Sequence, residues 1–232
     1  MARKITSRTW LLVVLIGFPS AQIFAAQPTP TIDWTIVPGQ RFGPMSLNTS
    51  EDELRELFGA GNVHRENIGV GEADTEPGTV VFPNTTRTFY VFWLDATKRE
   101  RIKEIHINGD KSAWKTDKGI NPRTALKQLE KLNGRPFSLM GFAWDYAGTI
   151  VDGNCGRLKE LGCVDPNDSA RVLRGRTLLL RLAPTKSVEN EMTASERKAY
   201  NEVMGETVYS SAHPAMQRIK PQVYTIIASF TP

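Results

Sequence analysis

The chain has 232 residues, of which 40% are hydrophobic, enough for the core of one larger domain or two small ones without a dense disulfide framework. Its formal net charge is +4, but Arg3, Lys4 and Arg8 lie in an N-terminal segment whose removal lowers the charge to +1. This nearly neutral balance predicts neither a nucleic-acid partner nor an electrostatic membrane patch.

The first 26 residues have the pattern of a cleavable secretory signal peptide. A basic start precedes the apolar run 10–18, and the small residues Ala25 and Ala26 follow it. The apolar run is too short to span a bilayer as a helix, although a retained membrane anchor is the alternative. Neither cysteine lies near the cleavage region to carry a lipid. We therefore expect a periplasmic or secreted protein with no stable membrane anchor after cleavage.

The first predicted helix begins at Ser50, because Ser50 and Glu53 have the spacing of a capping box. It should end at Gly59, with a buried face formed by Leu54, Leu57 and Phe58. A loop rich in glycine, asparagine and proline follows.

Three strands are then predicted, at residues 79–82, 87–94 and 101–107. The second is apolar on both faces and should lie centrally in its sheet. In the third, Ile105 and Ile107 should point to one face, and Glu104 and His106 to the other.

The pattern then begins again. Asn121 is expected to cap a helix that has Pro122 at its first position and that stops at Asn133 and Gly134. Its buried stripe would consist of Ala125, Leu126, Leu129 and Leu132.

A strand is predicted from Phe137 to about Ile150, followed by a polar turn at 165–169. A further strand should place Leu178, Leu180 and Leu182 on one face. A capped helix at 193–204 and a last strand at 222–230 complete the chain.

A helix followed by about three strands thus occurs twice, which is a weak internal repeat. The seam would lie at residues 111–119, where polar residues surround Trp114. The sequence predicts an α+β fold of two tandem modules, each a short helical segment packed on an antiparallel sheet of about three or four strands. The first module would span 27–118, and the second 119–232 with an inserted disulfide loop and an extra helix.

The two cysteines, Cys155 and Cys163, are eight positions apart. In an exported chain this spacing favours one structural disulfide that closes a short loop. A zinc site would need more ligands than two thiols, and a redox-active pair is usually closer in sequence, as in Cys-x-x-Cys.

The stretch 43–59 resembles the opening of helix-plus-sheet envelope modules such as the β-lactamase inhibitor proteins and the small lipoprotein of the outer-membrane assembly machine. Five residues carry this likeness: Gly43, Leu47, Leu54, Leu57 and Gly59. The resemblance implies an envelope binding module. The chain lacks the anchoring cysteine of the lipoprotein members.

A second resemblance, to an uncharacterised group of exported bacterial proteins, covers most of the mature chain. It implies a tandem architecture and a bacterial envelope location, and no particular activity. The residues that carry it are Trp114, Gly119, Ile120, Leu126, Leu129, Asn133, Gly134, Pro136, Phe137 and the run Gly141 to Gly148.

The sequence assigns no catalytic residue, metal ligand or cofactor. Neither a Gly-x-Ser-x-Gly elbow nor a Ser-x-x-Lys pair stands in a strand-to-helix setting, and no glycine-rich loop is followed by a lysine that could meet a phosphate. The histidines His64, His106 and His213 could each act as a general base, but without a partner motif they are interpreted as surface residues.

The aromatic row Phe142, Trp144 and Tyr146 has two interpretations, because large rings both fill cores and anchor interfaces. Alternation places the row, with Met140, on one face of the predicted strand and favours a core role. Asp145 would point the other way and be exposed. Trp144, Asp145 and Tyr146 are therefore candidate partner-binding residues.

Arg157 and Leu158 are further candidates, because a cross-linked loop loses less entropy when it docks. A plain surface loop is the alternative. The leading hypothesis is a periplasmic binding or inhibitor-like module that acts on another envelope or secreted protein.

Two other classes of function stay open: an envelope hydrolase whose site is assembled only in the fold, and a structural envelope-assembly factor. An exposed aromatic sheet surface would favour binding. A pocket with His106 or His213 beside a carboxylate would favour catalysis.

Overall fold

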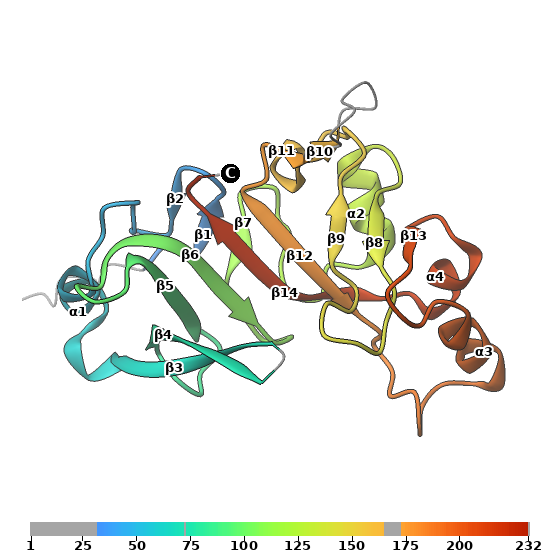
Figure 1. The fold of residues 1–232 in the computed structure, drawn as a ribbon, viewed down its shortest axis with the longest axis horizontal. Coiled ribbons are helices and arrows are strands. Elements are labelled where there is room, and N and C mark those ends of the chain that lie inside the picture. Colours follow the sequence, from blue (N-terminus) through green and yellow to red (C-terminus); the bar gives the residue numbers. More distant parts are fainter. Residues whose placement is uncertain (1–31, 72, 165–172, 232) are drawn as a thin grey trace, which may run out of the picture. The chain divides into compact units, whose positions relative to one another are not determined.

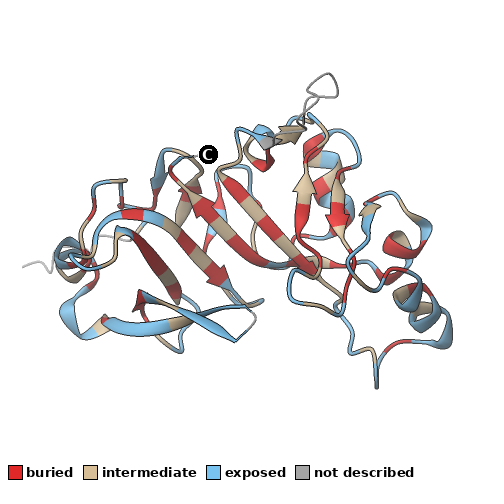
Figure 2. Cartoon of the chain, in the orientation of Figure 1, coloured by how far each residue is buried: buried red, intermediate tan, exposed pale blue. Residues whose placement is uncertain are grey.

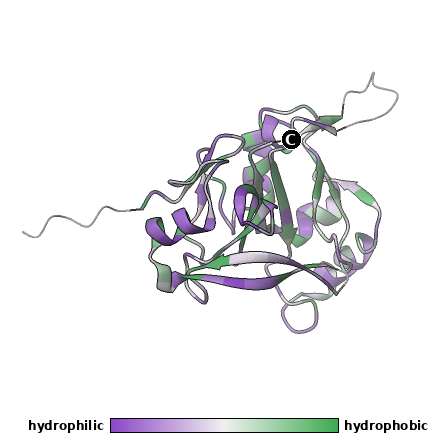
Figure 3. Cartoon of the chain, turned by 60° about the vertical axis from the view of Figure 1, so that its left-hand side comes forward, coloured by the Kyte–Doolittle hydropathy of each residue, from purple (hydrophilic) through white to green (hydrophobic). Residues whose placement is uncertain are grey.

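The structure is a computed structural model that describes residues 32–71, 73–164 and 173–231. The predicted signal peptide and the predicted turn at 165–169 lie outside these ranges. The described chain is α+β, as predicted, and consists mostly of antiparallel sheet with short helices at its edges (Figure 1). Hydrophobic segments lie along the interior strands, and hydrophilic ones along the surface helices and loops (Figure 3).

The main sheet is antiparallel throughout and has the strand order β12-β14-β6-β5-β4-β3. Its strands, in chain order, are β3 (Val63–Gly71), β4 (Asp74–Val81), β5 (Phe89–Asp95), β6 (Glu100–Asn108), β12 (Leu178–Ala183) and β14 (Gln222–Ser229). The pairing of β6 with β14 joins strands from both sides of residue 118. The central position predicted for the apolar strand β5, between β4 and β6, is confirmed.

The loop predicted after the first helix is wrong in one respect, because most of it forms the edge strand β3. Every residue of this strand after Val63 is exposed or half-buried. An edge strand packed on neither face lacks the alternation by which strands are recognised in a sequence.

The first helix, α1 (Glu51–Phe58), has the predicted capping box between Ser50 and Glu53 and ends at Gly59. Leu54 and Phe58 are buried, whereas Leu57 is 42% exposed, so its predicted place in the buried face is wrong. Residues four apart lie on one helix face, and Leu57 lies at the margin of that face. The short 3-10 turn η1 (Ala60–Asn62) leads into β3.

Trp114, at the expected seam, is fully buried, with its ring 5.0 Å from the rings of both Trp34 and Phe89. It immediately precedes β7 (Lys115–Thr116), which pairs in parallel with β1 (Thr35–Val37). Strand β2 (Arg41–Phe42) completes this small sheet. Residues 114–116 are therefore part of the packed structure.

The second predicted helix starts later than expected. Helix α2 spans Leu126–Asn133, and Ala125 is its N-cap. Asn121 and Thr124 instead form a hydrogen-bonded turn that pairs with the start of β14, which uses backbone groups that a helix would need. Gly134 ends the helix in the left-handed conformation, as predicted.

The predicted strand at 137–150 is wrong. Only β8 (Ser138–Met140) and β9 (Ile150–Asp152) are strands, and the residues between them form a loop closed by a 3.0 Å hydrogen bond from Gly148 N–H to the Gly141 carbonyl. A Cβ on Gly148 would lie 1.9 Å from the Leu182 carbonyl oxygen, so only glycine lets the loop approach β12 this closely. An antiparallel bridge between Thr149 and Arg181 also joins the two regions.

Strand β12 buries Leu178, Leu180 and Leu182, as predicted. Helix α3 (Ala194–Glu202) begins at the cap Thr193, and β14 ends one residue before the predicted limit. The remaining elements were not predicted, and they are short: η2 (Lys159–Leu161), β10 (Cys163–Val164), β11 (Leu173–Arg174), β13 (Val208–Ser210) and α4 (Pro214–Ile219). Strand β13 pairs with β8, and β10 with β11. Among the described helices, none is long and apolar enough to cross a membrane.

Candidate functional site

The two faces of the main sheet differ in how far their side chains are buried. Leu180, Ile226, Ile105 and Val91 point to the core and are fully buried. The alternate residues of the same strands point the other way and are mostly half-buried (Figure 2). We name this second side the open face, and its residues are Tyr90, Phe92, Glu104, His106, Leu179, Arg181, Thr225 and Ile227.

Strand register assembles the open face into rows. Tyr90 lies opposite His106, His106 opposite Ile227, and Ile227 opposite Leu179, so one row crosses four strands. A neighbouring row places Arg181 beside Thr225. Directly opposed side chains on one face of a sheet lie within contact distance, so these residues form a continuous surface.

Glu104 and His106 form a pair near the centre of the open face. His106 Nε2 lies 2.8 Å from Glu104 Oε1, and the imidazole ring lies 4.4 Å from the Phe92 ring. Burial raises the pKa of Glu104. The hydrogen bond from His106 and the positive charges of His106 and Lys103 lower this pKa by a larger amount, so it lies below the ordinary value of 4.5. Glu104 is therefore an ionised, half-buried carboxylate at neutral pH.

The loop 141–148 presents Trp144, Asp145 and Tyr146 beside the open face. The rings of Trp144 and Tyr146 are 5.3 Å apart in an edge-to-face arrangement. The Arg181 guanidinium lies 5.7 Å from the Tyr146 ring centre and donates a 3.4 Å hydrogen bond to the Asp145 carbonyl. The fold thus brings these three predicted residues together next to β12.

The predicted aromatic row does not exist, because the loop interrupts the alternation. Phe142 is buried and stacks on Tyr200 of α3 at 5.8 Å, whereas Tyr146 is 45% exposed. Asp145 is exposed, as predicted, and Trp144 is half-buried. Core and surface roles are therefore divided among the rings.

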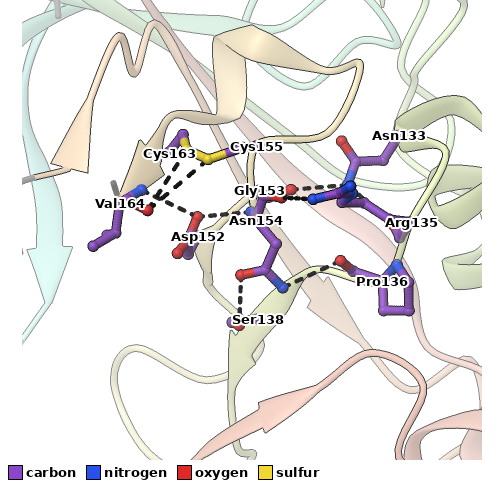
Figure 4. The surroundings of a disulfide bond; sticks show 10 residues. All are labelled: Asn133, Arg135, Pro136, Ser138, Asp152, Gly153, Asn154, Cys155, Cys163 and Val164. Carbon is purple, nitrogen blue, oxygen red and sulfur yellow. Dashed lines mark hydrogen bonds between the residues drawn. A yellow bond between two sulfur atoms is a disulfide. The ribbon is translucent and has the colours of Figure 1, made fainter. Parts of the chain in front are cut away.

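Cys155 and Cys163 are joined by the predicted disulfide, with their Cα atoms 4.9 Å apart. The buried Asn133 side chain anchors the loop between them: its amide donates to the Gly153 carbonyl at 2.9 Å, and its oxygen accepts from the Leu158 amide at 3.2 Å. Figure 4 shows Asn133 beside this cross-link, with Asp152 accepting from the Asn154 and Val164 amides. The sequence had assigned Asn133 only to the end of a helix.

The two loop residues predicted to contact a partner have different surroundings. Arg157 is exposed, and its guanidinium donates a 3.3 Å hydrogen bond to the Lys131 carbonyl at the end of α2. Leu158 is only 2% exposed and belongs to the hydrophobic core, so its predicted place on a docking surface is wrong. A short loop closed over a core turns its leucines inward, and Leu161 is buried in the same way.

A second cluster of charge surrounds Glu51, at the first position of α1. Its carboxylate is buried, pairs with Arg65 and Arg99, and accepts a 3.0 Å hydrogen bond from Thr79. Burial raises the pKa of Glu51, but the hydrogen bonds from Arg65 and Thr79 and the charges of Arg65 and Arg55 bring the net pKa below its ordinary value. These contacts hold α1 against β3 and β4. They also satisfy the buried Glu51 carboxylate, so no ligand is needed to account for its burial.

The other histidines have structural contacts. His213 caps α4 through Nδ1 and lies 3.8 Å from Glu202, and His64 contacts the Gly61 carbonyl. In residues 32–71, 73–164 and 173–231, no group of three or more histidines, cysteines and acidic residues could hold a metal ion.

Four residues of the open face were not predicted from the sequence: Tyr90, Leu179, Arg181 and Ile227. The alternation of β12 already separated Leu179 and Arg181 from the buried leucines, so one signal was present. The row itself depends on register between strands that are distant in sequence, which no local pattern encodes. In comparisons with known proteins, no family model, curated protein or solved structure matched the chain.

Proposed function

We propose that the chain is an exported binding or inhibitor-like module that docks another envelope or secreted protein against its open face. One observation carries this proposal: Tyr90, His106, Ile227 and Leu179 form a half-buried row across four strands, on the side of the sheet opposite its fully buried core face. Mixed aromatic, aliphatic and charged groups on a preformed surface suit protein recognition.

The loop 141–148 extends this surface. Trp144 and Tyr146 add two rings beside Arg181, and the backbone hydrogen bond between Gly148 and Gly141 holds the loop closed. A preformed loop loses little entropy on docking, so its rings can contribute to affinity. Tyr224, which is 54% exposed in β14, lies near the same end.

Export and modular organisation belong to the same proposal. The signal-like segment 1–26 would direct the chain to a compartment in which the Cys155–Cys163 disulfide persists. The two halves, 27–118 and 119–232, would each contribute a helix and strands, and would join where β6 pairs with β14. This organisation is the one implied by the resemblance to tandem envelope modules.

Site-specific photo-crosslinking tests the docking surface. The photoreactive residue p-benzoylphenylalanine would replace Tyr90 or Tyr224, and adducts would be isolated from the producing cells and identified by mass spectrometry. Leu57 is the matched control for Tyr224, because it is 42% exposed, against 54% for Tyr224, but lies on α1. We expect the same adduct from both tyrosine positions and none from Leu57.

The identified partner would then be purified and its affinity measured by calorimetry for the wild type and for Tyr90→Ala. A loss of affinity of tenfold or more is expected for an interface anchor. Adducts that form equally at Leu57, or an unchanged affinity of Tyr90→Ala, would place the interface elsewhere.

Catalysis is the second candidate function, and the Glu104–His106 pair favours it, since a carboxylate that orients a histidine is part of many acid–base sites. No hydroxyl or thiol of the described residues makes a hydrogen bond to His106, so the nucleophile would be water. Turnover of an envelope ester, amide or glycoside that is abolished in His106→Ala and retained in His64→Ala would support this reading over binding.

A further inference from the structure

A cavity of about 300 Å³ lies where the loop 141–148, α3 and the open face meet. Its walls are largely apolar and aromatic, and two charged residues, Arg181 and Asp145, reach it. The lining includes Phe142, Tyr200, Tyr224, Ala183 and Pro184.

Arg181 is short of acceptors in this cavity. In the part of the chain that the structure describes, its side chain makes one hydrogen bond, to the Asp145 carbonyl at 3.4 Å, which is long for a guanidinium donor, and none of these residues pairs with its buried Nε. Among the described residues, no carboxylate lies within ion-pair distance of Arg181. A guanidinium has five N–H donors, and the described residues accept from one of them.

A buried donor without an acceptor costs free energy, and the penalty is larger for a charged group. The nearest ring, that of Tyr146 at 5.7 Å, offers only a weak attraction to the cation. The fold nevertheless holds Arg181 in place through the bridge between its backbone and Thr149. The Arg181 guanidinium is thus positioned to donate two parallel hydrogen bonds to one bidentate acceptor.

We infer that this cavity binds a carboxylate group joined to an apolar body, with Arg181 on the carboxylate and the rings of Tyr200 and Tyr224 beside the apolar part. A planar carboxylate matches the fork of a guanidinium in two parallel hydrogen bonds. This inference rests on the proposed function for the source of the group, which is an acidic side chain of the docked protein.

Asp145 distinguishes an anionic ligand from a cationic one in this cavity. Asp145 also lines the cavity and is an exposed residue, so its negative charge should repel an incoming anion. Replacing Asp145 by asparagine should therefore tighten binding of a carboxylate, whereas it would abolish binding of a cation. Few other ligand chemistries predict opposite effects for Asp145 and Arg181.

The first experiment uses 3-phenylpropanoate as the probe and its neutral amide, 3-phenylpropanamide, as the matched ligand, followed by NMR on the purified chain. We expect saturable shifts at Ala143, Arg181 and Ala183, with a Kd on the order of millimolar for so small a ligand. Arg181→Gln should weaken the acid about tenfold and bring it to the level of the amide. Asp145→Asn should strengthen it several-fold.

Arg135→Gln is the control, because it removes one exposed arginine and the same charge, and Arg135 does not line the cavity. An equal loss in this variant, equal binding of acid and amide, or weaker binding in Asp145→Asn would overturn the carboxylate assignment. The Asp145→Asn measurement decides the matter even if Arg181→Gln does not fold.

The second experiment tests the source of the carboxylate, by measuring the crosslinking yield at Tyr90 in Arg181→Gln. A fall of about tenfold relative to Arg135→Gln is expected if the partner supplies the group. Unchanged crosslinking together with lost probe binding would show a site for free carboxylic acids and overturn the partner assignment. Absence of any crosslink, with probe binding intact, would refute the proposed function and leave the carboxylate site standing.

Discussion

Ile105 and His106 are neighbours on β6, but they lie in different surroundings. Ile105 is fully buried among core residues, whereas His106 is half-buried beside Glu104 and Phe92. Strand β12 repeats this division most regularly, whereas Phe92 of β5 and Thr225 of β14 lie on the open face and are buried. Because side chains alternate along a strand, one set of residues can hold the sheet together while the adjacent set is free to contact other molecules.

The sharpest comparison uses two leucines of β12, because the chemistry of the substitution is then identical. Leu180→Ala should lower the free energy of unfolding by about 3 kcal/mol, through lost burial and the cavity left behind. Leu179→Ala on the open face should cost about 1 kcal/mol or less. Urea denaturation of both variants measures the difference, and equal losses would mean that the open face is a second core.

The disulfide lies outside both faces of the main sheet. Removing it tests whether the fold of the sheet depends on the cross-link. Cys155→Ser with Cys163→Ser should lower the free energy of unfolding by about 2.5 kcal/mol, as expected for a short closed loop. The chain should stay folded, because Leu158 and Leu161 still pack into the core and Asn133 still holds the loop. Loss of near-UV circular dichroism in this variant would show that the loop depends on the cross-link.

Lowering the pH should destabilise the fold through protonation of Glu104 on the open face. The pKa of Glu104 is lowered in the folded chain, so its ionised form stabilises the fold above the ordinary pKa of 4.5, and this contribution is lost as the pH falls through the folded value. Glu104→Gln should remove that part of the pH dependence, at a cost near neutral pH of about 1 kcal/mol. Thermal melts of both proteins from neutral pH to below 4.5 test this, and parallel curves would exclude a role for Glu104.

The smallest effect on stability is expected at Tyr224. Its side chain is 54% exposed, so Tyr224→Ala should change the free energy of unfolding by less than about 0.5 kcal/mol. The same change should weaken partner binding, because the ring lies beside the cavity of Arg181. A large fall in Tm would show that Tyr224 has a structural role and would remove it from the proposed docking surface.

The elements that the sequence predicted correctly carry local signals. Ser50 with Glu53 marks the start of α1, Gly134 ends α2, and the leucines of β12 alternate without interruption. The disulfide followed from spacing and an expected oxidising compartment. None of these inferences requires knowledge of a distant residue.

The failures occurred where long-range contacts override a local pattern. The alternation at 137–150 was read as a strand, but Gly148 packs against the Leu182 carbonyl and closes a loop instead. Asn121 forms a turn with Thr124 that pairs with the start of β14, and it does not cap a helix. Arg181 gains its significance from Asp145 and Tyr146, which lie some 35 residues earlier in the chain, so no sequence motif marks it.

The position of β14 has a consequence for folding kinetics. It lies between β12 and β6, and its pairing with β6 joins residues such as Ile226 and Ile107 that are far apart in sequence. Contacts of this range form slowly, because a long chain segment must close before any hydrogen bond rewards it. Until β14 inserts, β6 remains an unpaired edge with hydrophobic side chains, which is the kind of surface that aggregates. Refolding yield should therefore fall with protein concentration, and a binding factor that covers β6 in the meantime would raise it.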